Sequence, residues 1–329
     1  MDLIIIWSGL VAFVMILYVV LDGIGLGVGV LFPGAQGEAE QDVMIESIAP
    51  VWDANQTWIV FGGGAIFAAF PVVYGVLSSA LYIPLITFVC GLIFRGVAFE
   101  FRANATRKGP WNNAFFAGSL VAVMSQGMTL GGVLSGIRVV DGHFGGGALD
   151  WLNPFSVMVS VALVPGYTML GSCYLILKTS GPVQERAYRQ AMWSAMAVLA
   201  FMAVVTVWTP FHYPVVLTHW FAPPRIYFVW IFPVIGLAAA YTLFKGLTTR
   251  REYLPLLSAI GLFLSGYSGL LTSLYPFAIP PSVTIYQAAA QPESLSFMLL
   301  GVGVVLPLVV AYSFYSHWVF RGKVRLEGY

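Results

Sequence analysis

Charged residues are scarce in this chain of 329 residues, of which Asp, Glu, Lys and Arg together make up 9%. A soluble globular domain carries about 25% charged residues, so that class is excluded. The net charge of +1 argues against a nucleic-acid partner. Hydrophobic residues make up 59% of the chain and its mean hydropathy is +0.86, which indicates a polytopic membrane protein.

Metal-binding and catalytic motifs are also lacking. The two cysteines, Cys90 and Cys173, lie in apolar runs, which is typical of small buried side chains and not of a disulfide or metal framework. The N-terminus has no basic region and no small-residue cleavage site, so it is predicted to be a retained first span. The histidines do not pair at helical spacing, and the sequence predicts no metal or heme site. They are His143, His212, His219 and His317.

Nine apolar runs are long enough to cross a bilayer, at about 20 residues each. We therefore expect an all-α integral membrane protein with about nine transmembrane helices. A tight turn at Gly75–Ser79 is predicted between the second and third spans. The runs lie near 3–31, 57–76, 79–99, 114–137, 155–177, 191–209, 226–246, 254–274 and 295–319.

Basic residues are distributed unevenly among the connections. The connections after the even-numbered spans hold only two basic residues, Arg138 and Arg225, whereas those after the odd-numbered spans hold many. A further basic residue, Arg95, lies inside the third span. This bias predicts an N-terminus outside and a C-terminus inside the cytoplasm. Twelve of the fifteen basic residues follow the third, fifth or seventh span or lie in the C-terminal tail: Arg102, Arg107, Lys108, Lys178, Arg186, Arg189, Lys245, Arg250, Arg251, Arg321, Lys323 and Arg325.

A weak internal repeat indicates how the spans are grouped. The sequence YVVL at 18–21 precedes Met44 by about the same interval as YTML at 167–170 precedes Met192. Two four-helix bundles in the same orientation would fit this repeat, since four crossings return the chain to its starting side. We expect one bundle at 1–137, a second at 138–274, and a peripheral ninth helix with a basic cytoplasmic tail at 275–329.

Asp22 lies deep in the first span. It shares a helix face with Tyr18, Gly25 and Gly29, because these residues are three or four apart. Its depth from the cytoplasmic end is about 13 Å at helical rise. An ionisable group at such a depth indicates a proton or ion site, or else a structural hydrogen bond between helices. The glycines of this span favour close helix packing.

Asp53 begins a second polar cluster, within VWDANQTWIVFGGGAIFAA at 51–69. Asp53 or Asn55 could simply cap the following helix. A cap needs only one such group, however, and the cluster also contains polar residues 56 and 57 between Trp52 and Trp58. This composition favours a water-holding entrance with exchangeable protons and aromatic walls.

The third span contains Arg95 and ends near Glu100. These two residues are about 140° apart around a helix and are poor partners for each other. Arg95 needs an anion, for which Asp22 and Asp53 are the candidates, and such a pair would hold the carboxylate ionised. The alternative is that Arg95 extends to the cytoplasmic headgroups.

Three stretches of the N-terminal third carry a family resemblance. YVVLDGIGLGVGVLFP at 18–33, MIESIAPVWDANQTWIVFGGGAIFAAFPVVYGVLSSALYIPL at 44–85 and FRGVAFEFR at 94–102 together resemble subunit II of the cytochrome bd quinol oxidase family. The similarity is greatest to the cyanide-insensitive branch. It continues more loosely through GYTMLGSCYLILKT at 166–179, so that it covers essentially the whole chain.

The resemblance implies a subunit of a respiratory terminal oxidase in the bacterial inner membrane. The complex would oxidise quinol and reduce oxygen to water with protons from the cytoplasm. It implies hemes b and d in the partner subunit I, and it allows a quinone or lipid in this chain and a small single-span accessory subunit. The family's proton-path residues map onto Asp22, Asp53 and Trp58. We add Trp52, Asn55, Arg95 and Glu100 as residues that shape this path.

The sequence departs from the family at two positions. Gly25 replaces a second carboxylate of the first span, which puts more weight on Asp22, and Ala54 replaces a glycine. Two alternatives to a proton-conducting oxidase subunit stay open. One is a purely structural scaffold whose carboxylates only cap or join helices, and the other is a secondary transporter, which would need broken helices in inverted repeats.

Overall fold

The computed structural model describes residues 2–212 and 229–324, with only the backbone described for 209–212. Arg225, His219, Arg325 and the first residues of the predicted seventh span lie outside this part, as does the side chain of His212. The helices are α1 (Leu3–Leu31), η1 (Phe32–Gly34), α2 (Glu38–Ile48), α3 (Trp52–Ala69), α4 (Pro71–Ala80), α5 (Tyr82–Ala103), α6 (Gly109–Leu134), α7 (Pro154–Lys178), α8 (Gly181–His212), α11 (Ile231–Thr248), α12 (Tyr253–Leu274), α13 (Ile285–Ala288) and α14 (Pro292–Val319).

Two short antiparallel hairpins connect helices at one end of the molecule. They pair β1 (Val139–Val140) with β2 (His143–Phe144), and β3 (Phe277–Ile279) with β4 (Val283–Thr284). Within the described residues, eight helices are long and apolar enough to cross a membrane, or nine if a bent pair counts as one span. The predicted all-α membrane fold is confirmed.

The predicted second span is the bent pair. α3 ends at Ala69, and α4 leaves it at an angle of 118°. Pro71 opens α4, since a proline lacks the amide hydrogen that would continue the α3 ladder but fits the first turn of a new helix. The tight turn predicted at Gly75–Ser79 is wrong, because these residues lie inside α4 and the chain turns again only at Leu81.

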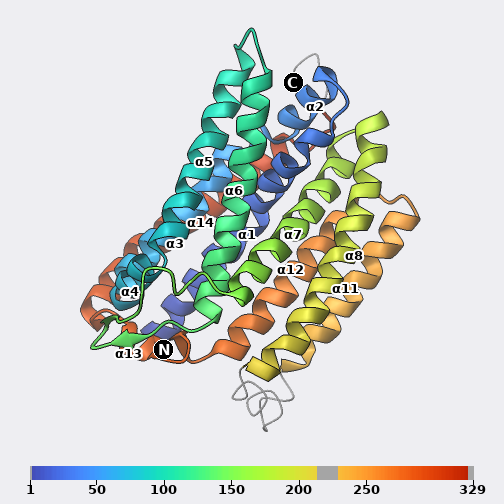
Figure 1. Cartoon of the computed structure of the whole chain (residues 1–329). Coiled ribbons are helices and arrows are strands. Elements are labelled where there is room, and N and C mark those ends of the chain that lie inside the picture. Colours follow the sequence, from blue (N-terminus) through green and yellow to red (C-terminus); the bar gives the residue numbers. More distant parts are fainter. Residues whose placement is uncertain (1, 213–228, 325–329) are drawn as a thin grey trace.

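The long helices run side by side, and the two termini lie at opposite ends of the molecule (Figure 1). The C-terminus and α2 share one end, and the N-terminus and α13 share the other. Ion pairs gather at the end that carries the C-terminus, where Arg250 meets Glu185 at 2.8 Å and Lys323 meets Glu252 at 2.6 Å. This separation of the ends agrees with an odd number of crossings.

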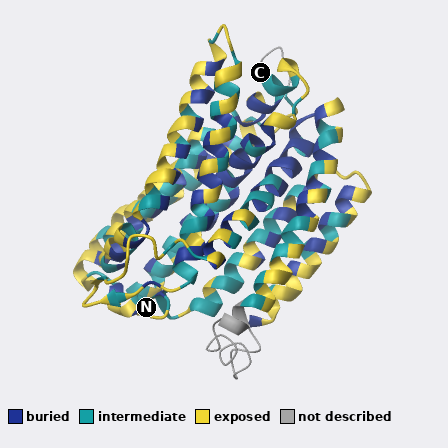
Figure 2. Ribbon diagram, viewed as in Figure 1, coloured by how far each residue is buried: buried dark blue, intermediate teal, exposed yellow. Residues whose placement is uncertain are grey.

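The core lies along α1 and α7 (Figure 2). The two helices approach so closely that a Cβ on Gly171 would lie 2.5 Å from the carbonyl carbon of Gly27. Tyr167 of α7 is fully buried against α1, and its hydroxyl donates to Oε1 of Gln126 at 2.9 Å. The larger of the two core clusters among the described residues therefore contains side chains from both of the predicted bundles.

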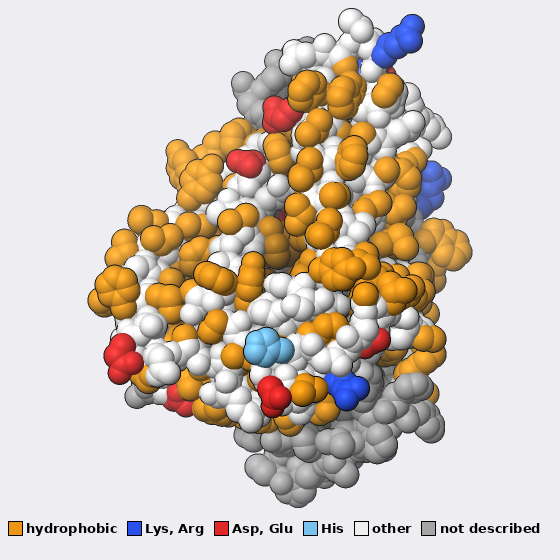
Figure 3. Space-filling view, turned by 60° about the vertical axis from the view of Figure 1, so that its left-hand side comes forward, with side chains coloured by type: hydrophobic (Ala, Val, Ile, Leu, Met, Phe, Trp, Pro, Cys, Tyr) orange, Lys and Arg blue, Asp and Glu red, His pale blue; other side chains and the backbone are white. Residues whose placement is uncertain are grey.

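The outermost helix is α14. Only 6% of its most apolar window is buried inside the chain, the lowest share among the candidate spans of the described residues. Its exposed side chains include Phe297, Leu300 and Phe314. Hydrophobic side chains are spread over much of the face shown in Figure 3. This surface suits lipid or another membrane subunit.

An acidic helix, α2, is held by cations from three other segments. Arg102 of α5 pairs with Asp42 at 2.7 Å, and Lys108 pairs with Glu38 at 2.6 Å. Arg186 of α8 donates two hydrogen bonds to Glu40. Because α2 leads directly into α3, these pairs fix the position at which α3 begins.

The Glu40–Arg186 pair predicts a dependence of stability on pH. Hydrogen bonds from Arg186 hold the pKa of Glu40 below its ordinary value. A lowered pKa adds stability above the ordinary pKa of glutamate, and that stability is lost as the pH falls through the lowered value. We expect Glu40→Gln to lower the stability of the complex at neutral pH by about 1 kcal/mol or less.

Thermal unfolding of the two proteins between pH 7 and pH 3 measures this effect. The difference between wild type and Glu40→Gln should close toward the acidic end. Glu46→Gln is the matched control, because Glu46 is exposed on the same helix and has no ion pair among the described residues. A difference that grows on acidification would contradict the prediction.

Candidate functional site

Asp22 and Arg95 form an ion pair in the interior of the chain. Nη1 of Arg95 donates to Oδ1 of Asp22 at 2.7 Å, and the two side chains are 1% and 0% exposed. Arg95 therefore does not extend to the headgroups, and of its two candidate anions it binds Asp22. Removing one partner of such a pair leaves an uncompensated buried charge.

Gly25 makes this pair sterically possible. A Cβ at position 25 would overlap Nη2 of Arg95 and would also approach Oδ1 of Asp22. The guanidinium thus occupies the space that a side chain on Gly25 would need. From the sequence alone, Gly25 was notable only because the family usually has a carboxylate at this position. A helical pattern shows which residues share a face, but not which neighbouring side chain fills the space in front of it.

Several buried polar atoms of α1, α3 and α5 have no well-aligned hydrogen-bond partner in the described part of the chain, although the Tyr18 hydroxyl lies close to Asp22. Five of them are potential donors and two are acceptors. Buried polar groups that lack a protein partner are commonly bridged by ordered water. The donors are Nε and Nη2 of Arg95, the Tyr18 hydroxyl, Nε1 of Trp58 and Nε2 of Gln56; the acceptors are Oδ2 of Asp22 and Oδ1 of Asn55.

Asn55 connects α3 to α1. Its Nδ2 donates to the carbonyl oxygen of Leu21, the residue before Asp22, at 3.0 Å. Trp58 is buried, and Trp52 packs against Phe99 of α5 with 5.2 Å between ring centroids. The three residues predicted to shape an entrance thus lie between α3 and its two neighbours.

Asp53 lies on the opposite, exposed side of α3. The N-cap of α3 is Val51 and has no side-chain capping bond, so neither Asp53 nor Asn55 caps the helix through its side chain. Asp53 stands in the first turn, where a carboxylate interacts favourably with the helix dipole. It has no hydrogen bond or ion pair with the other described residues, which leaves its carboxylate available for exchange.

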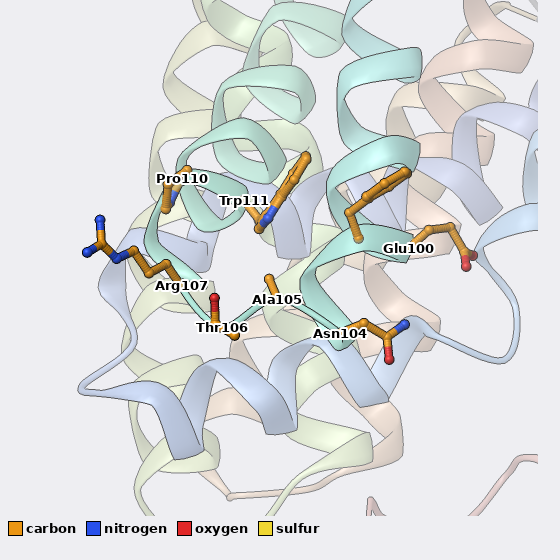
Figure 4. Close-up of a pocket in the computed structure, with 8 residues that line it drawn as sticks. Glu100, Asn104, Ala105, Thr106, Arg107, Pro110 and Trp111 are labelled. Atoms are coloured by element: carbon orange, nitrogen blue, oxygen red, sulfur yellow. The ribbon is translucent and has the colours of Figure 1, made fainter.

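Glu100 is exposed near the end of α5, away from the buried pair. It lines a surface pocket between α5 and α6 together with Phe101, Asn104 and Arg107 (Figure 4). The predicted site residues therefore fall into three places: a buried group around Asp22, an exposed Asp53, and an exposed Glu100.

The comparisons with known proteins identify the family. Residues 3–320 match the family described as cytochrome bd terminal oxidase subunit II. The chain belongs to this family. It is 29% identical to the cytochrome bd-I ubiquinol oxidase subunit 2 of Escherichia coli strain K12, over 98% of this chain and 95% of that protein. It is 31% identical to the cytochrome bd ubiquinol oxidase subunit 2 of Bacillus subtilis strain 168, over 97% and 96%.

A solved structure shares the fold. The bd oxidase structure from Geobacillus thermodenitrificans contains a chain that matches with a TM-score of 0.80 at 16% identity, over 97% of this chain and 99% of that one. The resemblance noted in the sequence is thus confirmed. The chain is a multi-pass subunit II of a bd-type quinol oxidase, an oxidoreductase complex of the bacterial inner membrane, and subunit I is its partner.

Proposed function

We propose that this subunit II provides a proton path from the cytoplasm toward the heme-bearing subunit I. Asp53 would collect protons at the start of α3, and Glu100 would be the outermost carboxylate of the path. Water bridging Asn55, Trp58 and the Asp22–Arg95 pair would connect Asp53 to the interior. The observation that supports this path best is the group of unpartnered buried polar atoms next to Asp53, whose carboxylate is exposed and does not cap α3.

The partner would lie against α3 and α14. The exposed face of α3 begins with two polar residues, Asp53 and Thr57, and continues with Val60, Gly64 and Phe67 at helical spacing. No atom lies within 4 Å of a Cβ built on Gly64, so this face accepts another helix closely. A subunit I bound against the apolar part of this face would lie next to Asp53 and would receive the protons that pass through the buried polar group. The odd-numbered connections would face the cytoplasm, as the distribution of basic residues predicts.

Hemes b and d would be carried by subunit I. In the described part of this chain, His143 lies exposed on a hairpin, and Nδ1 of His317 is bonded along its own helix to the carbonyl of Ser313. Neither residue lies in the core along α1 and α7, because His143 is exposed and His317 stands near the end of α14, the least buried candidate span of the described residues. The complex would pass electrons from quinol to oxygen there, while this chain supplies protons. A bound quinone or lipid in this chain and a small single-span accessory subunit also belong to this proposal.

A purely structural role is the second candidate for Asp22 and Arg95. The direct 2.7 Å contact favours it, because a closed ion pair joins α1 to α5 without any proton transfer. The two roles make different predictions, which are taken up in the Discussion. No comparable observation favours a transporter: within the described residues, the bent pair α3–α4 has no counterpart in the second half.

Asp53→Asn tests the path. We expect oxygen consumption with quinol by the purified complex to fall by about tenfold to hundredfold, because amide nitrogen cannot carry the proton of a carboxylic acid. The heme absorbance spectrum should stay that of the wild type, since Asp53 makes no bond to the rest of the described chain. Glu46→Gln, an exposed change on α2, is the control. Wild-type turnover in a spectroscopically intact Asp53→Asn complex would remove Asp53 from the path.

A further inference from the structure

A surface pocket of about 780 Å³ lies where α5 meets α6, outside the buried polar group. Its wall and floor are formed by the last turn of α5, the connecting loop and the first turn of α6. The position along the bilayer follows from helix length. Glu100 stands 18 residues after Tyr82, at which α5 begins. At 1.5 Å per residue it lies about 27 Å along the helix, close to the thickness of a hydrocarbon core. The pocket is therefore at headgroup level.

The two charges of the pocket are separated. Figure 4 shows Arg107 and Pro110 at one side, Glu100 and Asn104 at the other, and Thr106 on the floor between them. Arg107 and Glu100 form no ion pair or hydrogen bond with any other described residue, in contrast to Arg102 and Lys108 close by. A cation and an anion held apart without partners match a ligand that carries both signs.

The aromatic residues of the pocket are stacked on each other. Phe101 and Trp111 have their ring centroids 5.3 Å apart at an interplanar angle of 26°. Tryptophan at this depth is typical of the membrane interface. Because the two rings cover each other's inner faces, they do not form the open aromatic cage that recognises a quaternary ammonium. Below Phe101, the exposed side chains Phe94 and Val97 continue along α5 toward the bilayer centre.

We propose that this pocket binds the headgroup of phosphatidylethanolamine. The phosphate would lie at the guanidinium of Arg107 and the Thr106 hydroxyl, since arginine binds phosphate with paired hydrogen bonds. The primary ammonium would donate to the carboxylate of Glu100 and the side-chain carbonyl of Asn104. The acyl chains would lie over Phe101 and the exposed apolar face of α5. A headgroup with net charge zero matches the pocket, whereas an anionic headgroup would leave Glu100 unpaired.

The test measures lipid binding and not turnover, so its outcome is independent of the proton path that includes Glu100. The complex of subunits I and II is purified, depleted of lipid, and returned to nanodiscs that contain phosphatidylethanolamine, phosphatidylcholine or phosphatidylglycerol. Retained lipid is counted by native mass spectrometry. A photoactivatable phosphatidylethanolamine should crosslink to the segment 100–111.

Two variants separate the two ends of the headgroup. Glu100→Gln should reduce the preference for phosphatidylethanolamine over phosphatidylcholine by about threefold to fivefold, the effect of one exposed charge pair. Arg107→Gln should weaken the retention of all three lipids by a similar factor. Glu46→Gln and Arg251→Gln are matched controls, because both residues are exposed on other segments at the same end of the molecule.

Three results would overturn the proposal. One is an equal retention of the three lipids by the wild type, and another is an equal loss of preference in Glu46→Gln and Glu100→Gln. The third is a crosslink of the segment 100–111 to subunit I instead of the lipid, which would make the pocket a protein interface. Preference lost only in Glu100→Gln, with the crosslink in place, supports the lipid site.

Discussion

Asp22→Asn is expected to lower the stability of the assembled complex by about 3–5 kcal/mol, because it leaves the buried charge of Arg95 without its partner. Arg95 is 1% exposed and has no other hydrogen bond from its guanidinium to the described residues. The midpoint of thermal unfolding, followed by loss of the heme spectrum, should fall by at least about 6 °C. Glu46→Gln on α2 is the control and should cost less than about 0.5 kcal/mol, since Glu46 is exposed.

A second variant makes this prediction sharper. Asp22→Asn combined with Arg95→Met removes both charges, and replacement of a whole buried pair is often close to neutral. The double variant should therefore recover at least half of the stability that the single variant loses. A single variant as stable as the wild type, or a double variant less stable than the single one, would show that the ion pair does not join α1 to α5.

The double variant also separates the two roles of the pair. If Asp22 carries protons, a stable complex without its carboxylate should consume oxygen slowly, as Asp53→Asn does. If the pair is only structural, turnover should return together with stability. Turnover and heme retention should be measured on the same preparation. If the pair is structural, the two quantities should fall and recover together. If Asp22 carries protons, turnover should stay low in a complex that retains its hemes.

The sequence predicted the all-α membrane fold well because the signal is local. A run of about 20 apolar residues is a span by itself, and α1 begins and ends at the predicted residues 3 and 31. The break between α3 and α4 was missed for the same reason. Pro71 lies inside an apolar run, and hydropathy alone does not distinguish a proline that kinks a span from one that opens a new helix.

The candidate site was predicted in part. The depth of Asp22 in an apolar run showed that it needed a special environment, and the same logic applied to Arg95. Which anion Arg95 binds could not be predicted, because that depends on the packing of α1 against α5. The space at Gly25 and the cations around α2 likewise arise only when helices far apart in the sequence meet. The role of Asp53 could not be predicted from this chain alone, because Asp53 is exposed and its surroundings depend on the subunit that binds there.

The close crossing of α1 and α7 gives the second large prediction. A Cβ on Gly27 would overlap the backbone carbonyl oxygen of Tyr167 and lie 3.0 Å from the amide nitrogen of Gly171. Both obstacles are backbone atoms of a buried helix, so no side-chain rotation can relieve them. Gly27→Ala should therefore force the helices apart and cost about 3 kcal/mol or more, at the upper end of overpacking effects. We expect little assembled complex in the membrane.

Two other glycines of α1 show what this loss depends on. No atom lies within 4 Å of a Cβ built on Gly9, so Gly9→Ala should be neutral or slightly stabilising, as alanine favours a helix. At Gly25 the obstacle is the end of the flexible Arg95 side chain, so Gly25→Ala should weaken the ion pair but still allow assembly. The expected order of complex yield is Gly9→Ala, then Gly25→Ala, then Gly27→Ala. Equal yields would mean that α1 and α7 do not meet at Gly27.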